Sequence, residues 1–129
     1  MILDTSAILA ILFREPEWDR LIGALEGAAS IACGAPTLAE TGIVLGHRQG
    51  FASGKLQRFV QEFGVRSVPF SDEHWAQAVH AYEKFGKGRH GANLNFGDCL
   101  SYSVAKLSRL PLLFVGDDFS QTDLGRVEF

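Results

Sequence analysis

Short apolar runs alternate with helical patterns of apolar and polar residues along the whole chain. Runs that could be covered on both faces predict β-strands at residues 1–4, 30–33, 66–70, 112–115 and 127–129. Between them, apolar residues recur at the spacing of a helix face. This alternation predicts an α/β fold, a single domain over residues 1–129 with a mainly parallel central sheet of about four to five strands flanked by helices.

The predicted helices each turn one apolar stripe inward. They cover residues 7–13, 17–26, 37–48, 53–63, a segment that opens at Ser71 and Asp72, and residues 98–109. The inward stripes near the C-terminal end are expected to be Trp75, Val79 and Tyr82 in one helix, and Leu100, Val104 and Leu107 in the next.

The first predicted strand ends at a carboxylate. Ile2 and Leu3 are apolar and lead directly to Asp4, so this strand is expected in the middle of the sheet. In open α/β sheets, ligands bind beyond the carboxyl ends of the strands, which is where Asp4 would lie. The alternative is that Asp4 only caps the helix that follows.

Further carboxylates stand at comparable places. Glu40 lies in a predicted helix among apolar and small residues, where a charged group needs a cation, a metal or a hydrogen-bond donor. The alternative is a Glu that faces solvent. Asp98 stands at a helix N-terminus, where capping alone could explain it. Asp117 and Asp118 follow the strand at 112–115.

These acids could converge at one edge of a parallel sheet. Carboxylates that meet there would repel one another unless divalent cations lay between them. Ligation by oxygen alone suits Mg²⁺ or Mn²⁺, and such a site can activate water for attack on a phosphodiester.

The charge of the chain is slightly acidic, with 12 Lys and Arg against 15 Asp and Glu, a net charge of −3. This balance argues against nucleic-acid binding by bulk electrostatics. The cations do gather in one glycine-containing segment, 84–91, which holds Lys84, Lys87, Arg89 and His90. Lys87 and Arg89 are candidates for contacts with an RNA backbone, and the alternative is a solvated surface loop.

Other features indicate a cytoplasmic protein with no membrane association. Cys33 and Cys99 are too few for a disulfide framework and are expected to be buried thiols in a reducing compartment. No basic segment precedes the apolar N-terminus, and no apolar stretch is long enough to cross a membrane.

Four short motifs together resemble the acidic motifs of PIN-domain ribonucleases, and the set is similar to VapC-type toxins of type II toxin–antitoxin systems. They are residues 2–7 (ILDTSA), 38–41 (LAET), 94–99 (LNFGDC) and 113–119 (LFVGDDF). The resemblance extends over the whole chain. It implies an endoribonuclease dependent on Mg²⁺, for which Mn²⁺ could substitute, acting on RNA.

The resemblance also implies roles for individual residues and partners. The catalytic, metal-binding acids would be Asp4, Glu40, Asp98 and Asp118, with the adjacent Asp117 as the alternative fourth acid, and Thr5, Ser6 and Asn95 would support the site. Members of this family form homodimers and are inhibited by a cognate antitoxin, whose C-terminal segment wraps the toxin and reaches the acidic groove. The expected assembly is therefore a homodimer or a toxin–antitoxin hetero-oligomer.

Two other functions compete with this one. An aspartyl-phosphate phosphatase would need a second Asp two residues after Asp4, where this chain has Ser6. A catalytically silent module that binds RNA or protein could keep the fold. Four retained acids argue against it, because without a metal their repulsion would destabilise the protein.

Overall fold

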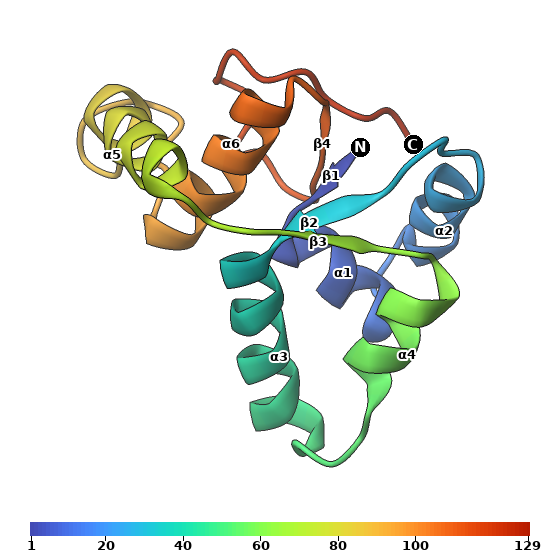
Figure 1. Cartoon of the computed structure of the whole chain (residues 1–129). Coiled ribbons are helices and arrows are strands. Elements are labelled where there is room, and N and C mark those ends of the chain that lie inside the picture. Colours follow the sequence, from blue (N-terminus) through green and yellow to red (C-terminus); the bar gives the residue numbers. More distant parts are fainter.

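A parallel sheet of four short strands runs through the middle of the molecule, with helices on both faces (Figure 1). The computed structural model describes all residues, 1–129. The strands are β1 (Ile2–Leu3), β2 (Ala32–Gly34), β3 (Arg66–Val68) and β4 (Leu112–Leu113), in the order β3-β2-β1-β4. The predicted α/β class and parallel sheet are confirmed.

Helices cover the sheet in two layers because neighbouring strand residues point to opposite faces. The helices are α1 (Thr5–Leu12), α2 (Trp18–Glu26), α3 (Ala35–Gln49), α4 (Lys55–Glu62), α5 (Asp72–Phe85) and α6 (Phe96–Ser108). Leu3 and Leu113 join a core with residues of α1, α2 and α4. Ile2 and Leu112 join a second core with residues of α5 and α6. No helix is long and apolar enough to span a bilayer.

β1 is an interior strand, as its apolar sequence predicts. Ile2 pairs with Ala32 on one side and with Leu112 on the other. The backbone N–H of Asp4 continues this pairing by donating to the carbonyl of Leu113 at 3.0 Å. The first acid is therefore fixed at the carboxyl end of the most central part of the sheet.

The predicted inward stripe of α5 is wrong. Trp75 and Val79 are 57% and 61% exposed, and Tyr82 is also exposed. The buried residues of α5 are instead Ala78, Ala81 and Phe85. Both stripes have helical spacing, but the small alanine side chains allow α5 to pack closely against α6, which leaves the larger residues on the outer surface.

Two expectations at the C-terminal end are also wrong. Residues 127–129 form no strand, and only the preceding residue, Arg126, makes an isolated bridge to Leu112 of β4. Leu107, expected inside, is 38% exposed. The buried residues of α6 lie between Cys99 and Ala105, so its last turn extends beyond the layers that cover the rest of the helix.

Candidate active site

Four carboxylates from four separate segments lie near the carboxyl edge of the sheet, where the charges of three of them act on Asp98. Asp4 ends β1, Glu40 lies on α3, Asp98 lies in the first turn of α6, and Asp118 follows β4. The pKa of Asp98 reflects this grouping. Burial is the main cause that raises it, to about 6, and the negative charges of Asp4, Asp118 and Glu40 raise it further, against the hydrogen bond from Asn95.

Asp4 is held by two serine hydroxyls. It is only 5% exposed, and it caps α1 through a bond from the Ser6 backbone N–H to Oδ2 at 3.0 Å. The Ser6 hydroxyl donates to the same oxygen at 2.6 Å and accepts from the N–H of Val115 at 3.0 Å. The Ser101 hydroxyl donates to Oδ1 at 2.6 Å. Asp4 therefore caps α1 and also connects it to α6 through Ser101.

Ser101 was missed from the sequence. It lies on α6, ninety-seven positions from Asp4, and is 1% exposed. The only signal in the sequence is a small polar residue at an inward position of the helix, beside apolar neighbours. This signal is ambiguous, because a serine at such a position can also donate a hydrogen bond to the backbone of its own helix. Only the packing of α6 against β1 identifies its partner.

Glu40 is exposed, so the expectation that it lies among apolar side chains is wrong. The buried residues of α3 are Thr37, Thr41, Leu45 and Gly46, while the Glu40 carboxylate lies against Gly97 in the first turn of α6. Its Oε1 accepts from the Thr5 hydroxyl at 2.6 Å. A Cβ at Gly97 would collide with the Glu40 carboxylate, so the glycine leaves room for this side chain.

The helix that carries Asp98 begins earlier than expected, at Phe96, with Asn95 as its N-cap. The Asn95 side chain accepts from the Asp98 N–H at 2.9 Å, and Asp98 Oδ2 accepts from the Asn95 N–H at 3.0 Å. This reciprocal capping box orients Asp98 through one of its two oxygens. The other oxygen makes no protein hydrogen bond and can face a ligand.

The remaining acids are exposed on the segment after β4. Gly116, with a positive φ of 97°, turns the chain out of the strand immediately before them. Asp118 is among the charges that raise the pKa of Asp98, and Asp117 is not. This difference favours Asp118 as the fourth acid of the group.

The chemistry of these residues fits a hard divalent cation. All the candidate ligands are carboxylate oxygens, which Mg²⁺ and Mn²⁺ prefer. The two ion pairs of the protein, Arg20–Glu17 and Lys106–Asp123, lie elsewhere, so no cationic side chain neutralises the four acids. The side chains do not form a ready-made cage, because no three Asp, Glu, His or Cys residues are arranged to hold a metal ion together. The fit therefore rests on charge and ligand type.

Comparisons with known proteins agree with this architecture. Residues 1–124 match the PIN domain family. Ribonuclease VapC36 from Mycobacterium tuberculosis is 47% identical over 126 residues, which cover 96% of this chain and 91% of that protein. Ribonuclease VapC from Mycolicibacterium smegmatis is 40% identical, with 98% and 99% covered. The chain therefore belongs to the PIN-domain family and, within it, to the VapC ribonucleases.

Solved structures support the fold at lower sequence identity. VapC20 from Mycobacterium tuberculosis, described as a toxin that cleaves the sarcin-ricin loop, aligns with a TM-score of 0.78 at 18% identity over 98% of both chains. FitAcB from Neisseria gonorrhoeae aligns with a TM-score of 0.72 at 20% identity, with 98% and 96% covered. At these identities the likeness concerns the fold.

Asp98→Asn is expected to stabilise the metal-free protein at pH 7. The folded state binds the Asp98 proton more tightly than the unfolded state, so stability falls as pH rises from about 3.8 to about 6 and stays lower above that range. Asn keeps the cap and removes the charge. Urea unfolding with EDTA should give a gain of about 1 to 2 kcal/mol at pH 7, since one pKa unit is about 1.4 kcal/mol and partial exposure screens it.

The exposed Asp117→Asn provides the control for that measurement. It should leave the pH dependence of unfolding between about pH 4 and 7 close to that of the parent. A parent-like pH profile for Asp98→Asn would show that the acidic group does not strain the fold.

Proposed function

We propose that the chain is the toxin of a toxin–antitoxin pair, an endoribonuclease that hydrolyses RNA phosphodiesters and depends on Mg²⁺, for which Mn²⁺ can substitute. The observation that carries the proposal is that Asp4, Glu40 and Asp118 lie near enough for their charges to raise the pKa of Asp98, and that none of the four acids has a cationic partner. Membership of the VapC ribonucleases supplies the substrate class.

In this proposal the four acids hold the cation, and their neighbours hold the acids. When bound, a divalent cation lowers the pKa of water and offsets phosphate charge. Ser6 and Ser101 orient both oxygens of Asp4, Thr5 orients Glu40, and Asn95 orients Asp98. These donors are neutral, so they direct the carboxylates without neutralising the charge that attracts the cation.

Cleavage and metal binding should depend on the same residues. The parent should cut a panel of structured RNAs only with Mg²⁺ or Mn²⁺, and millimolar Mn²⁺ should raise its melting temperature, because a ligand bound only by the native state adds RT ln(1 + [L]/Kd) to stability. Asp4→Asn should lose both effects. Asp118→Asn should lose cleavage, and Asp117→Asn should retain it.

Gly97→Ala tests the site without removing a carboxylate. The added Cβ would displace the flexible end of the Glu40 side chain and would contact no backbone atom of another segment. The free energy of unfolding should therefore change by less than about 1 kcal/mol, while the rate of RNA cleavage falls. Asp19→Asn, at an exposed position of α2, is the matched control for the Asp→Asn variants of the site, and it should retain cleavage. Metal-independent cleavage by the parent, or full activity of folded Asp4→Asn, would contradict the proposal.

The loop between α5 and α6 supplies cations for the flanking RNA phosphates. Lys87 and Arg89 are exposed and form no ion pair. The loop is shaped locally, since the Gly88 N–H donates to the side chain of Asn93 at 3.0 Å. An acidic site repels the phosphates that it cuts, so cations beside it would favour RNA binding.

Lys87→Ala and Arg89→Ala should weaken RNA binding and make its salt dependence shallower by roughly one unit of slope for each lost phosphate contact. Their stability should stay within about 0.5 kcal/mol of the parent. Arg66→Ala, which removes an exposed cation from β3, should leave the slope unchanged. If the salt dependence of RNA binding had the same slope in the parent and in all variants, the loop would not contact RNA phosphates.

We assign the two expected protein partners to two different surfaces. The apolar surface of α5 and α6 is lined entirely by apolar residues, including Phe70, Trp75, Val79, Tyr82, Phe96 and Leu100. In a two-fold dimer the same patch meets its own copy, and this surface can do so without facing like charges. Phe96, 77% exposed, would be covered there. A second copy of the chain is therefore its proposed occupant.

A groove of about 310 Å³ between α1, α2 and α4 has a different character. Its floor includes Ile11, Ile22 and Phe59, and its rim carries Arg14, Lys55 and Arg58 with a single acid, Glu62. If two copies of the chain met at this groove, their cationic side chains would lie close together and repel one another. An apolar segment with acidic neighbours complements the groove, and the antitoxin is its proposed occupant.

The two tryptophans separate these assignments, since Trp75 lies on the apolar surface and Trp18 lines the groove. Val79→Lys should convert the parent dimer to a monomer in sedimentation, while His80→Lys, at an exposed position of the same helix outside the apolar surface, should not. In Trp75→Phe, an amphipathic acidic peptide should change the fluorescence of Trp18, and Arg58→Glu should abolish this change. A monomeric parent would overturn the dimer assignment, and peptide binding that survives Arg58→Glu would overturn the groove assignment.

A further inference from the structure

Asp118 lies on a segment without helix or strand, residues 116–125. Its carboxylate is exposed and takes part in neither ion pair of the protein. Its location relative to Asp98 therefore depends on what holds the segment in place.

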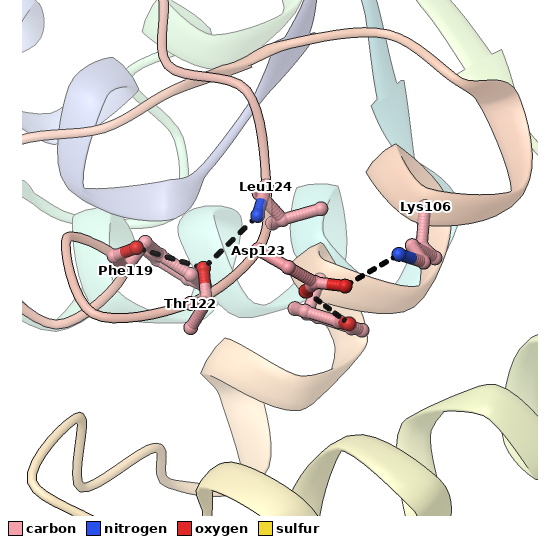
Figure 2. A network of polar contacts seen from close by, with 6 residues as sticks. Lys106, Phe119, Thr122, Asp123 and Leu124 are labelled. Carbon is pink, nitrogen blue, oxygen red and sulfur yellow. Dashed lines mark hydrogen bonds and ion pairs between the residues drawn. The ribbon is translucent and has the colours of Figure 1, made fainter.

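One anchor of the segment is apolar. Phe119 is buried, with its ring 5.1 Å from that of Phe114. The hydroxyl of Thr122 closes the turn by donating to the carbonyl of Phe119 at 2.7 Å, and it accepts from the N–H of Leu124 at 3.4 Å (Figure 2). These contacts attach the segment to Phe114 and to the hydrophobic core that includes buried residues of α6, but they provide no hydrogen bond or ion pair to that helix.

The second anchor is Asp123, which connects the segment to α6. The hydroxyl of Tyr102 donates to Oδ1 at 2.6 Å. The ammonium group of Lys106 donates to Oδ2, also at 2.6 Å (Figure 2). Burial alone would raise the pKa of Asp123, but the hydrogen bonds from Lys106 and Tyr102 lower it overall. Both oxygens are thus occupied by donors from one helix.

That helix also carries Asp98. Tyr102 and Lys106 follow Asp98 by four and eight residues, roughly 6 and 12 Å along a rigid axis. The negative charges of Asp98 and Asp118 repel each other, which would favour movement of the segment into solvent. A bond from the segment to α6 opposes this movement.

We propose that Asp123 is a positioning residue, which acts with Tyr102 and Lys106 to keep Asp118 beside Asp98. The inference rests on the proposed function, because it assigns Asp118 to the cation site. Asp123 itself touches neither substrate nor cation. Its effect on cleavage passes through the location of Asp118.

The experiment measures the segment and the site separately in the full-length protein. Tyr102→Phe keeps the ring and removes the hydroxyl, and Lys106→Met removes the charge from an exposed position. In metal-free protein, hydrogen exchange of residues 116–123 should accelerate at least about fivefold in each variant, the order expected for one lost hydrogen bond. The Mn²⁺ concentration that gives half of the thermal stabilisation should rise by a similar factor.

Two comparisons make the test specific. Ser103→Ala removes another hydroxyl of α6, one that donates only to the carbonyl of Leu100, and should match the parent in both measurements. The double variant Asp123→Ala with Lys106→Met should show the same hydrogen exchange and the same Mn²⁺ midpoint as Asp123→Ala alone, because both changes remove the same ion pair. Asp123→Asn keeps an acceptor for Tyr102, so its hydrogen exchange and its Mn²⁺ midpoint should lie between those of the parent and those of Asp123→Ala.

The outcomes separate this proposal from the proposed function. Parent-like exchange of residues 116–123 and parent-like Mn²⁺ response in Tyr102→Phe and Lys106→Met would overturn the positioning role, even if the parent cleaves RNA. Faster exchange with an unchanged Mn²⁺ midpoint would also overturn it, since the segment would then be held for stability alone. Loss of metal response and cleavage in the parent itself would count against the proposed function instead.

Discussion

Repulsion among like charges is the constraint on which this structure depends. Burial is the largest cause of the raised pKa of Asp98, and the negative charges of Asp4, Asp118 and Glu40 raise it further. A salt bridge to Lys or Arg would relieve this repulsion, but would also fill the site with protein cations. The fold instead uses hydroxyl and amide donors, which restrain carboxylates individually and leave their summed charge available to a ligand.

The helix α6 connects most of these restraints. Its first turn contains Asp98, its buried side contributes Ser101 to Asp4, and Tyr102 and Lys106 further along the helix donate hydrogen bonds to Asp123. The same helix packs against α5 and against the sheet, including β1, so its location is set by the hydrophobic core that it shares with α5 and by the strands. The positions of these side chains are thus fixed by the close packing of α6, because a packed helix deforms little along its length.

Much of the arrangement follows from local sequence. The strand that ends at Asp4, its central place in the sheet and the parallel order could be predicted because burial of both strand faces leaves a continuous apolar run. The cap at Asn95 escaped prediction, although asparagine three residues before Asp98 is a recognisable signal. Of the site residues, Ser101 had the weakest signal, since its partner is distant in sequence.

The errors share a physical cause. The stripes of α5 through Trp75 and through Ala78 have the same periodicity, and hydrophobicity alone favours the larger residues. The choice between them depends on how closely a neighbouring helix approaches and on whether another chain covers the outer face. Leu107 was misplaced for a related reason, because helix length relative to its covering layer is a tertiary property.

The pairing of β1 with β4 also bears on how this protein is made. Ile2 and Leu3 pair with Leu112 and Leu113, and the four acids are spread from position 4 to position 118. A growing polypeptide on the ribosome cannot complete the central sheet, or bring the first and last acids together, until nearly all of the chain has been synthesised. Incomplete translation products would consequently lack the assembled site. Nuclease activity of a chain with this topology would therefore arise only when synthesis is nearly complete.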